Sequence, residues 1–449
     1  MVAAAHLTTP AVEAYLRHRT GVTAPTTLAW PQRLLRSKWT WLTVVLLLTY
    51  SAALWAFVTD IMADRDNGDG SVTPGLNADA LWTSFGRALP TLAFWIVCFV
   101  LIDRYKPQRA LVWLLVVAWG GCAAVTGAYF INNWVGSRMA VVDGSAGTMA
   151  IRLAVFVAPF VEEAAKACVI FLIAVMDRNR FTSRVSGAII GGLAGAGFAF
   201  TENIIYYARV IVYGSYTSGA GDVAAFLDYL VYMRGVLTAF GHPMFTMMTG
   251  LGVAFALTSR SKIVRVLAPA AGYLLAAFLH MFFNFWMSVL GDQQVVPVVL
   301  IGVWPVVILI LLRVVMSSVR QGRTVAARLN DYVAMGWLPP TYPAAFSRLR
   351  SRAWTVLMSL WHGNVIRTWQ LQVRVTELAM LREAITRGTV DASVGREYEL
   401  VEEIARLARL RGLADGRGLR PYWPWRAARR VRGPALKYSV VDSRWGPPV

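Results

Sequence analysis

Apolar stretches recur along this chain at lengths that suit a membrane. They cover residues 39–59, 86–103, 109–131, 149–176, 185–209, 229–258, 264–290 and 295–316. An α-helix rises 1.5 Å per residue, so about twenty apolar residues cross a hydrocarbon core that is about 30 Å thick. The pattern therefore predicts an all-α integral membrane protein with eight transmembrane helices.

Basic residues alternate between the loops and predict the orientation. They lie before the first helix and in every second loop: Arg33, Arg36 and Lys38; Arg104, Lys106 and Arg109; Arg178, Arg180 and Arg184; Arg260, Lys262 and Arg265; then Arg320, Arg323 and Arg328. The other loops carry few. Because Lys and Arg stay on the cytoplasmic side, we expect both termini in the cytoplasm. With 39 arginines and 5 lysines, a bias typical of GC-rich bacterial genes, the expected location is a bacterial plasma membrane.

Three regions follow from this reading. Residues 1–38 form a cytoplasmic segment, residues 39–316 the membrane domain, and residues 317–449 a cytoplasmic region with 22 basic and 10 acidic residues. Within the last region, residues 364–387 and 393–412 show the spacing of amphipathic helices. The formal charge of +19 then reflects cytoplasmic surfaces beside anionic lipid, and we expect no nucleic-acid partner.

The acidic loop between the first two predicted helices contains Asp64, Asp66 and Asp69, with Gly68 and Gly70 between and after them. An EF-hand register fails here, because it places an arginine at the first ligand position. We interpret the segment as a turn and not as a calcium loop.

Ionisable residues inside the apolar stretches are the most informative feature. A charged side chain at mid-membrane costs several kcal/mol, so such residues are usually paired or functional. Four consecutive predicted helices carry Glu162, Glu163 and Lys166; Glu202; Arg234 and His242; His280 and Asn284. Polar groups at this depth need water or one another, which predicts a wet pocket between these helices.

Helical spacing sorts some of these residues. Lys166 lies four residues after Glu162 and three after Glu163, so it can pair with either. Adjacent residues point about 100° apart. One glutamate is therefore expected to do chemistry and the other to position groups. Gly187, Gly191 and Gly195 predict a close helix contact that continues toward Glu202.

These motifs together resemble the PrsW intramembrane proteases, which are related to the CAAX prenyl endopeptidases. The resemblance rests on Glu162-Glu163-x-x-Lys166, Phe198-x-x-x-Glu202, the isolated His242, and His280-x-x-x-Asn284, and it covers about residues 150–290. CAAX-type members carry Arg after the glutamates and His in place of Glu202, which favours the PrsW branch. The resemblance implies an endopeptidase that cleaves membrane-associated proteins, with anti-sigma factors as a substrate class.

Amide hydrolysis needs an activated water, stabilisation of the oxyanion, and a proton donor for the leaving amine. We expect Glu162 or Glu163 to be the general base, with Glu162 preferred, and His242 and His280 to orient water or stabilise the oxyanion. Asn284 would donate to the oxyanion.

Three residues then remain as supporting groups. Arg234 would hold a carboxylate, and Lys166 and Glu202 would support the site. The alternative is a divalent metal such as zinc, which two imidazoles and one carboxylate would suit. We favour the metal-free route; the sequence lacks the His-Glu-x-x-His spacing of zincins.

A proton- or cation-coupled transporter is the second interpretation of the same residues. Two matching halves are typical of such proteins, whereas the polar residues here gather in the fourth to seventh predicted helices. A receptor with a basic tail is the third interpretation.

Overall fold

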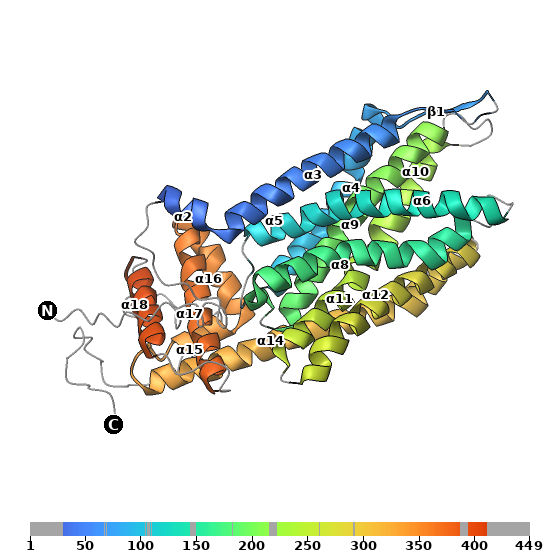
Figure 1. Ribbon diagram of the computed structural model, residues 1–449. Helices are drawn as coiled ribbons and strands as arrows, with labels where there is room; N and C mark the ends of the chain where they lie inside the picture. The colour runs from blue at the N-terminus through green and yellow to red at the C-terminus, as the bar shows by residue number, and fades with distance from the viewer. Residues whose placement is uncertain are drawn as a thin grey trace.

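The computed structural model describes residues 30–410, apart from 67, 69, 104, 106, 107, 109, 144–149, 182, 215–221, 260, 291 and 387–393. Figure 1 shows long helices that run side by side through most of the molecule, with α15 to α18 gathered at one end. Most of the predicted segment 1–38, the tail after residue 410, and Asp69 lie outside the described residues.

The apolar stretches form the long helices of the structure, several of them continued by π-helical turns (η). In order they are α2 (Trp30–Arg36), α3 (Lys38–Met62), α4 (Ala78–Ile102), α5 (Ala110–Ala118), η1 (Trp119–Ala124), α6 (Val125–Asp143), η2 (Leu153–Val157), α8 (Ala158–Met176), the 3-10 turn η3 (Arg178–Arg180), α9 (Arg184–Gly214), α10 (Val223–Tyr232), η4 (Met233–Leu237), α11 (Gly241–Thr258), α12 (Lys262–Val289), α13 (Asp292–Pro297), η5 (Val298–Val303) and α14 (Trp304–Ala334). The protein is therefore an all-α, multi-pass membrane protein.

Seven helices among the described residues are long and apolar enough to cross a membrane: Lys38–Met62, Ala78–Ile102, Ala110–Met139, Arg184–Gly214, Val223–Thr258, Lys262–Val289 and Val298–Ala334. The eighth predicted span, 149–176, corresponds to η2 and α8. It is helical, but its charged residues Glu162, Glu163 and Lys166 set it apart from the apolar seven. The count of eight and the orientation stay predictions.

Helix α9 lies at the centre of the bundle and packs against α11 without intervening side chains. A Cβ atom added to Gly187, Gly191 or Gly195 would lie 2.2–2.4 Å from the carbonyl oxygens of Gly250, Thr246 and His242 respectively. The close contact predicted from the three glycines is confirmed. The backbones of α9 and α11 are therefore in direct contact, so that a small shift of one helix moves the other.

The predicted helix 229–258 is not continuous. It consists of α10 and η4, a turn at residues 238–240, and then α11. Pro243 lies in the first turn of α11, where a missing N–H costs nothing. Thr238 Oγ1 instead donates to Met233 O at the break. Irregular backbone at membrane depth is tolerated where it lines a polar cavity.

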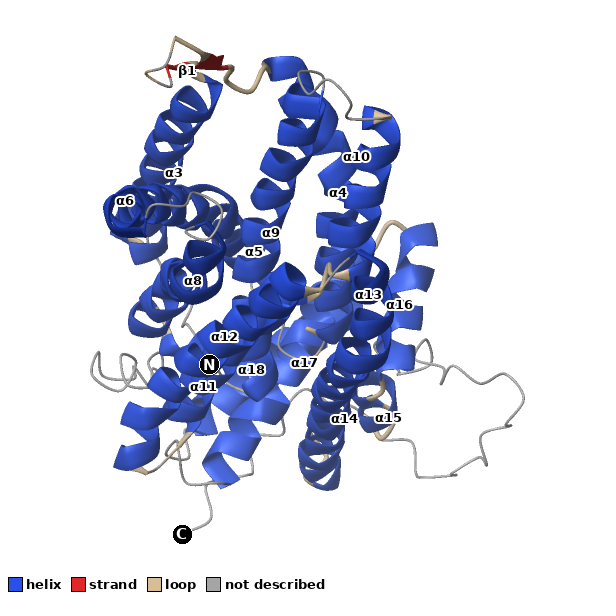
Figure 2. Ribbon diagram, turned by 90° about the vertical axis from the view of Figure 1, so that its right-hand side faces the viewer, coloured by secondary structure: helices blue, strands red, loops and turns tan. Residues whose placement is uncertain are grey.

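The acidic loop forms a short hairpin of β1 (Arg65–Asp66) and β2 (Val72–Thr73), at the opposite end of the molecule from α15 to α18 (Figure 1). Its carboxylates accept backbone hydrogen bonds: Asp66 from Gly68 and Asp64 from Gly75. Figure 2 shows that this hairpin is the strand-bearing part of an otherwise helical structure, as far as the described residues go.

The C-terminal region adds four helices, α15 (Tyr342–Ser347), α16 (Leu349–Trp361), α17 (Val365–Thr386) and α18 (Val394–Leu410). The two helices predicted at 364–387 and 393–412 are confirmed as α17 and α18. Their apolar positions, including Leu371, Val375, Leu400 and Ile404, are buried together with the end of α14. We call α15 to α18 with the last turns of α14 the C-terminal unit.

Candidate active site

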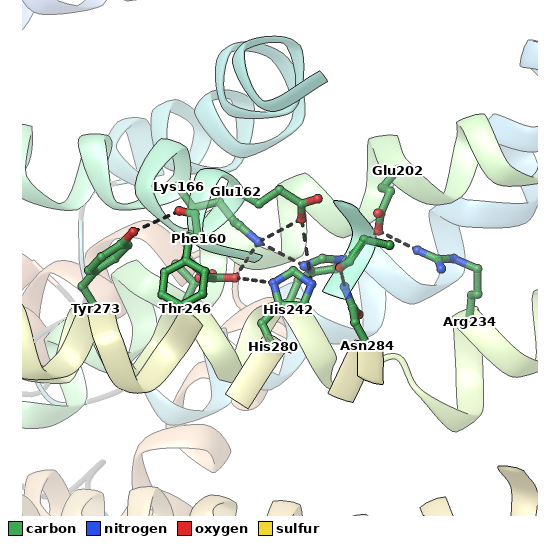
Figure 3. Close-up of polar contacts among 12 residues, drawn as sticks. Phe160, Glu162, Lys166, Glu202, Arg234, His242, Thr246, Tyr273, His280 and Asn284 are labelled. Atoms are coloured by element: carbon green, nitrogen blue, oxygen red, sulfur yellow. Dashed lines mark hydrogen bonds and ion pairs between the residues drawn. The ribbon is translucent and has the colours of Figure 1, made fainter. Parts of the chain in front are cut away.

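The predicted polar residues converge from α8, α9, η4, α11 and α12 on one place between these helices. Figure 3 shows them pointing toward one another, with Glu162 and Lys166 above His242 and His280, and Glu202 beside Arg234. The packing of α9 on α11 sets this arrangement, because it places the Glu202 turn of one helix beside the His242 turn of the other.

Glu163 is completely buried and has a partner for each carboxylate oxygen. Its Oε1 lies 2.7 Å from Lys166 Nζ and 3.2 Å from His280 Nδ1. Its Oε2 accepts a hydrogen bond of 2.8 Å from Thr246 Oγ1. A carboxylate that is paired in this way is held in place, and it orients both the lysine and the imidazole.

Glu162 differs from its neighbour. Its Oε2 is buried and has no hydrogen-bond partner. Lys166 Nζ lies 3.8 Å away and His280 Nε2 lies 3.9 Å away, both beyond hydrogen-bond length. Lys166 therefore hydrogen-bonds Glu163 and makes only a longer ion pair with Glu162.

His242 is held at both ring nitrogens. Lys166 Nζ lies 3.0 Å from Nδ1, and Glu202 Oε2 lies 2.7 Å from Nε2. Because an ammonium can only donate, Nδ1 accepts and Nε2 donates to the carboxylate. The centroid of the His242 ring lies 5.1 Å from that of the Phe198 ring. Lys166 Nζ lies over the Phe198 ring, 4.1 Å from its centroid.

Arg234 reaches the cluster from η4 and neutralises Glu202. Its Nη2 lies 2.5 Å from Glu202 Oε2, and its Nε donates to Asn203 Oδ1 at 2.9 Å. The guanidinium lies 3.9 Å from the centre of the Tyr206 ring. The predicted pairing of Arg234 with a carboxylate is therefore confirmed. The π-helical turn η4 directs Arg234 toward α9.

His280 stands next to His242, with ring centroids 4.9 Å apart and planes perpendicular. Phe245 stacks on it at 5.1 Å. Since Glu163 Oε1 lies at Nδ1, the ring turns Nε2 toward Glu162. Each imidazole thus has a carboxylate on its outer nitrogen, Glu163 for His280 and Glu202 for His242. Such outer partners fix the tautomer and the direction of a catalytic imidazole.

Asn284 lies one turn beyond His280 and has a different contact from the one expected. Its Nδ2 donates to Ala154 O at 2.9 Å, a carbonyl within η2. One of its two amide hydrogens is therefore used to hold η2 against α12. Tyr273 makes a similar bond from the same helix to Phe160 O, at 3.1 Å (Figure 3).

Sequence reasoning missed Thr246 and Asn203. A threonine in an apolar helix carries no signal of its own, because its hydroxyl commonly bonds the preceding turn of its helix. The spacing does carry one signal in retrospect: Thr246 lies four residues after His242, on the same face of α11.

A divalent metal fits the donor set. Glu162, His242 and His280 offer ligand atoms that all lie within 4.8 Å of one another. Two imidazoles and a carboxylate, with a further position open, are the ligands of many zinc hydrolases. The partnerless Oε2 of Glu162 is the observation that supports such an ion, while the Lys166 ammonium beside His242 Nδ1 competes with it.

Carboxylates and imidazoles enclosed by membrane helices are groups that a peptidase working within the membrane can use to activate water. The family model described as PrsW family intramembrane metalloprotease matches residues 106–312 of this chain, which supports an intramembrane peptidase. The resemblance drawn from the motifs is confirmed, and the match is wider than the motifs alone. No curated protein and no solved structure matches the chain.

Proposed function

We propose that this protein is an endopeptidase that cleaves membrane-associated proteins beside or within the bacterial plasma membrane, with Glu162, His242 and His280 as its reacting groups. Anti-sigma factors anchored in the membrane are the substrate class that the family resemblance implies. The observation that carries the proposal is the buried, partnerless Oε2 of Glu162, which faces His280 Nε2 across 3.9 Å. In this proposal, these two groups hold the attacking water.

The surrounding residues hold this geometry. Glu163 and Lys166 of α8 hold each other in place through their hydrogen bond, and Glu163 also orients His280. Glu202, neutralised by Arg234, aligns His242. Glu162 accepts the proton of the attacking water and passes it to the leaving amine, as a general base and then a general acid. The second amide hydrogen of Asn284 is proposed as a donor to the oxyanion.

When a divalent metal is bound by Glu162, His242 and His280, it supplies a Lewis acid and a water of lowered pKa. The roles of Glu163 and Glu202 are the same with or without that ion, because both act on the imidazole rings from outside.

The test uses the purified full chain in proteoliposomes with a single-pass membrane substrate. Glu162→Gln should lower the cleavage rate by about 10²–10⁴-fold, the usual contribution of a general base, and leave the melting temperature unchanged. Glu399→Gln, at an exposed site in the C-terminal unit, is the matched control and should cleave like the wild type. Wild-type turnover by Glu162→Gln would exclude this carboxylate from the chemistry.

Metal analysis of the same samples separates the two routes. If a metal is bound, its content should fall in Glu162→Gln and in His280→Ala, and a chelator should stop cleavage by the wild type. If cleavage survives the chelator in metal-free protein while Glu162→Gln is inactive, the glutamate acts alone.

A further inference from the structure

Helix α16 exposes apolar residues and buries polar ones, which is the reverse of the usual pattern for a helix on the surface of a soluble unit. Three of its polar residues are buried: Ser351, Arg352 and Ser359 have exposed fractions of 7%, 2% and 2%. Its apolar residues face outward: Leu357, Leu360 and Trp361 are exposed by 47%, 59% and 81%. Leu360 and Trp361 follow Leu357 by three and four residues, so the three side chains form one stripe along the helix. We call this stripe, with Ile366 at the start of α17, the α16 face.

The polar side of α16 is used to attach the helix. Arg352 Nη1 donates to Thr376 Oγ1 at 2.7 Å and to Phe346 O at 3.2 Å, and Gln372 Nε2 donates to Arg352 O. Since α17 therefore takes the polar side of α16, the apolar side is left to face away from the C-terminal unit.

The α16 face begins where the membrane helices end. Tyr105, which follows α4 closely, donates from its hydroxyl to Ser347 O just before α16, and Arg352 lies over its ring at 5.4 Å. Trp369 and Val373 of α17 line the end of an apolar groove of about 1190 Å³ that runs between α3, α4, α5 and α9. Ile366 lies three residues before Trp369, on the same side of α17, and is 75% exposed.

We propose that the α16 face lies in the headgroup region of the adjacent leaflet, the cytoplasmic one by the loop charges, as a monotopic anchor of the C-terminal unit. With 13 residues α16 is too short to span the bilayer but has the length and tryptophan content of an interfacial helix. Exposed Arg348 and Arg350 at its N-terminal end suit anionic headgroups. Apolar contact continues from the groove onto α17, which favours lipid over a separate protein partner. This inference does not rest on the peptidase chemistry.

The experiment measures membrane depth in the full chain. In a background where Cys98, Cys122 and Cys168 are replaced by alanine, Leu357→Cys and Trp361→Cys each carry a nitroxide spin label. Arg406→Cys is the control, an exposed position on α18, which Figure 1 shows farther from the membrane helices than α16. Collision of each label with oxygen, which concentrates in lipid, is compared with collision with a water-soluble nickel chelate. The protein is placed in vesicles of phosphatidylcholine and phosphatidylglycerol.

Both α16 labels should show a ratio of oxygen to nickel collisions several-fold above that of the label at position 406. Equal ratios at all three positions would place the α16 face in water and overturn the inference. Protection of the α16 labels from both reagents would mean that protein covers the face, as in a dimer, and would overturn it as well. Two separate labelling positions guard against one variant that fails to fold.

Discussion

The site between the membrane helices and the C-terminal unit both bury charged groups, but they do so differently. In the membrane site, Glu163 and Lys166 are fully buried and pair with each other. In the C-terminal unit, arginines and glutamates form ion pairs at partly exposed positions, such as Arg374 with Glu377 and Glu403. Water screens the second kind of pair, which then contributes little to stability, whereas a broken pair of the first kind is costly.

The two regions differ in what their charged residues contribute to stability and to function. The C-terminal unit is held by an apolar core that includes Leu371, Val375 and Leu400, so its ion pairs are replaceable. The membrane site has charged residues where apolar ones would pack as well or better. Their presence there is best explained by chemistry, and the most direct evidence is the partnerless oxygen of Glu162.

The largest effect should come from breaking the buried pair. Glu163→Gln leaves the Lys166 ammonium without its carboxylate, so we expect a loss of about 3–5 kcal/mol in the free energy of unfolding. Because His280 also loses its outer partner, cleavage should fall about 10–100-fold. Thermal unfolding in detergent and cleavage in proteoliposomes measure the two effects.

Replacement of both partners is the control for that prediction. The double variant Glu163→Gln with Lys166→Met removes the unpaired charge, so it should recover most of the lost stability while cleavage stays low. If the single variant unfolds at the wild-type temperature, the pair is not the buried, unscreened pair that the structure describes.

An intermediate effect is expected from the helix contact that sets the site. In Gly195→Ala the new Cβ would lie 2.2 Å from His242 O, so α9 and α11 must separate. A shift of about 1 Å at a reacting group can cost about 100-fold in rate. Gly127→Ala in α6 is the matched control, because its Cβ would meet nothing within 4 Å. Equal cleavage rates in the two variants would show that the contact tolerates expansion.

The smallest effect should be seen in the C-terminal unit. Glu399→Gln removes a partner of Arg396 at a position whose side chain is 50% exposed, so its cost should stay within about 1 kcal/mol. Cleavage should equal that of the wild type. A stability loss as large as that of Glu163→Gln would remove the contrast between the two regions.

Much of the architecture was predictable because long apolar runs and glycine spacing are strong local signals. The contact through Gly187, Gly191 and Gly195, and the gathering of Glu162, Glu202, His242 and His280, followed from spacing and from the cost of charge in lipid. Boundaries were less predictable: the span expected at 295–316 continues as helix to Ala334, because charged residues after the apolar run are also good helix formers.

Partner choice within the site could not be predicted. Lys166 can reach either glutamate along the helix, and only the neighbouring helices decide the matter, through Thr246 and His280 on Glu163. The break at residues 238–240 was also missed. Helix α16 was not predicted, because its apolar stripe is too short to stand out from a loop.

Helix α14 runs for 31 residues without interruption from the membrane bundle into the C-terminal unit. At 1.5 Å per residue it is a rod of about 46 Å, stiff over that distance. Pivoting such a rod by about 5° at one end carries the other end sideways by about 4 Å. Bilayer thickness and lateral pressure set the tilt of a membrane helix. A change in either one therefore displaces the C-terminal unit at the other end of α14.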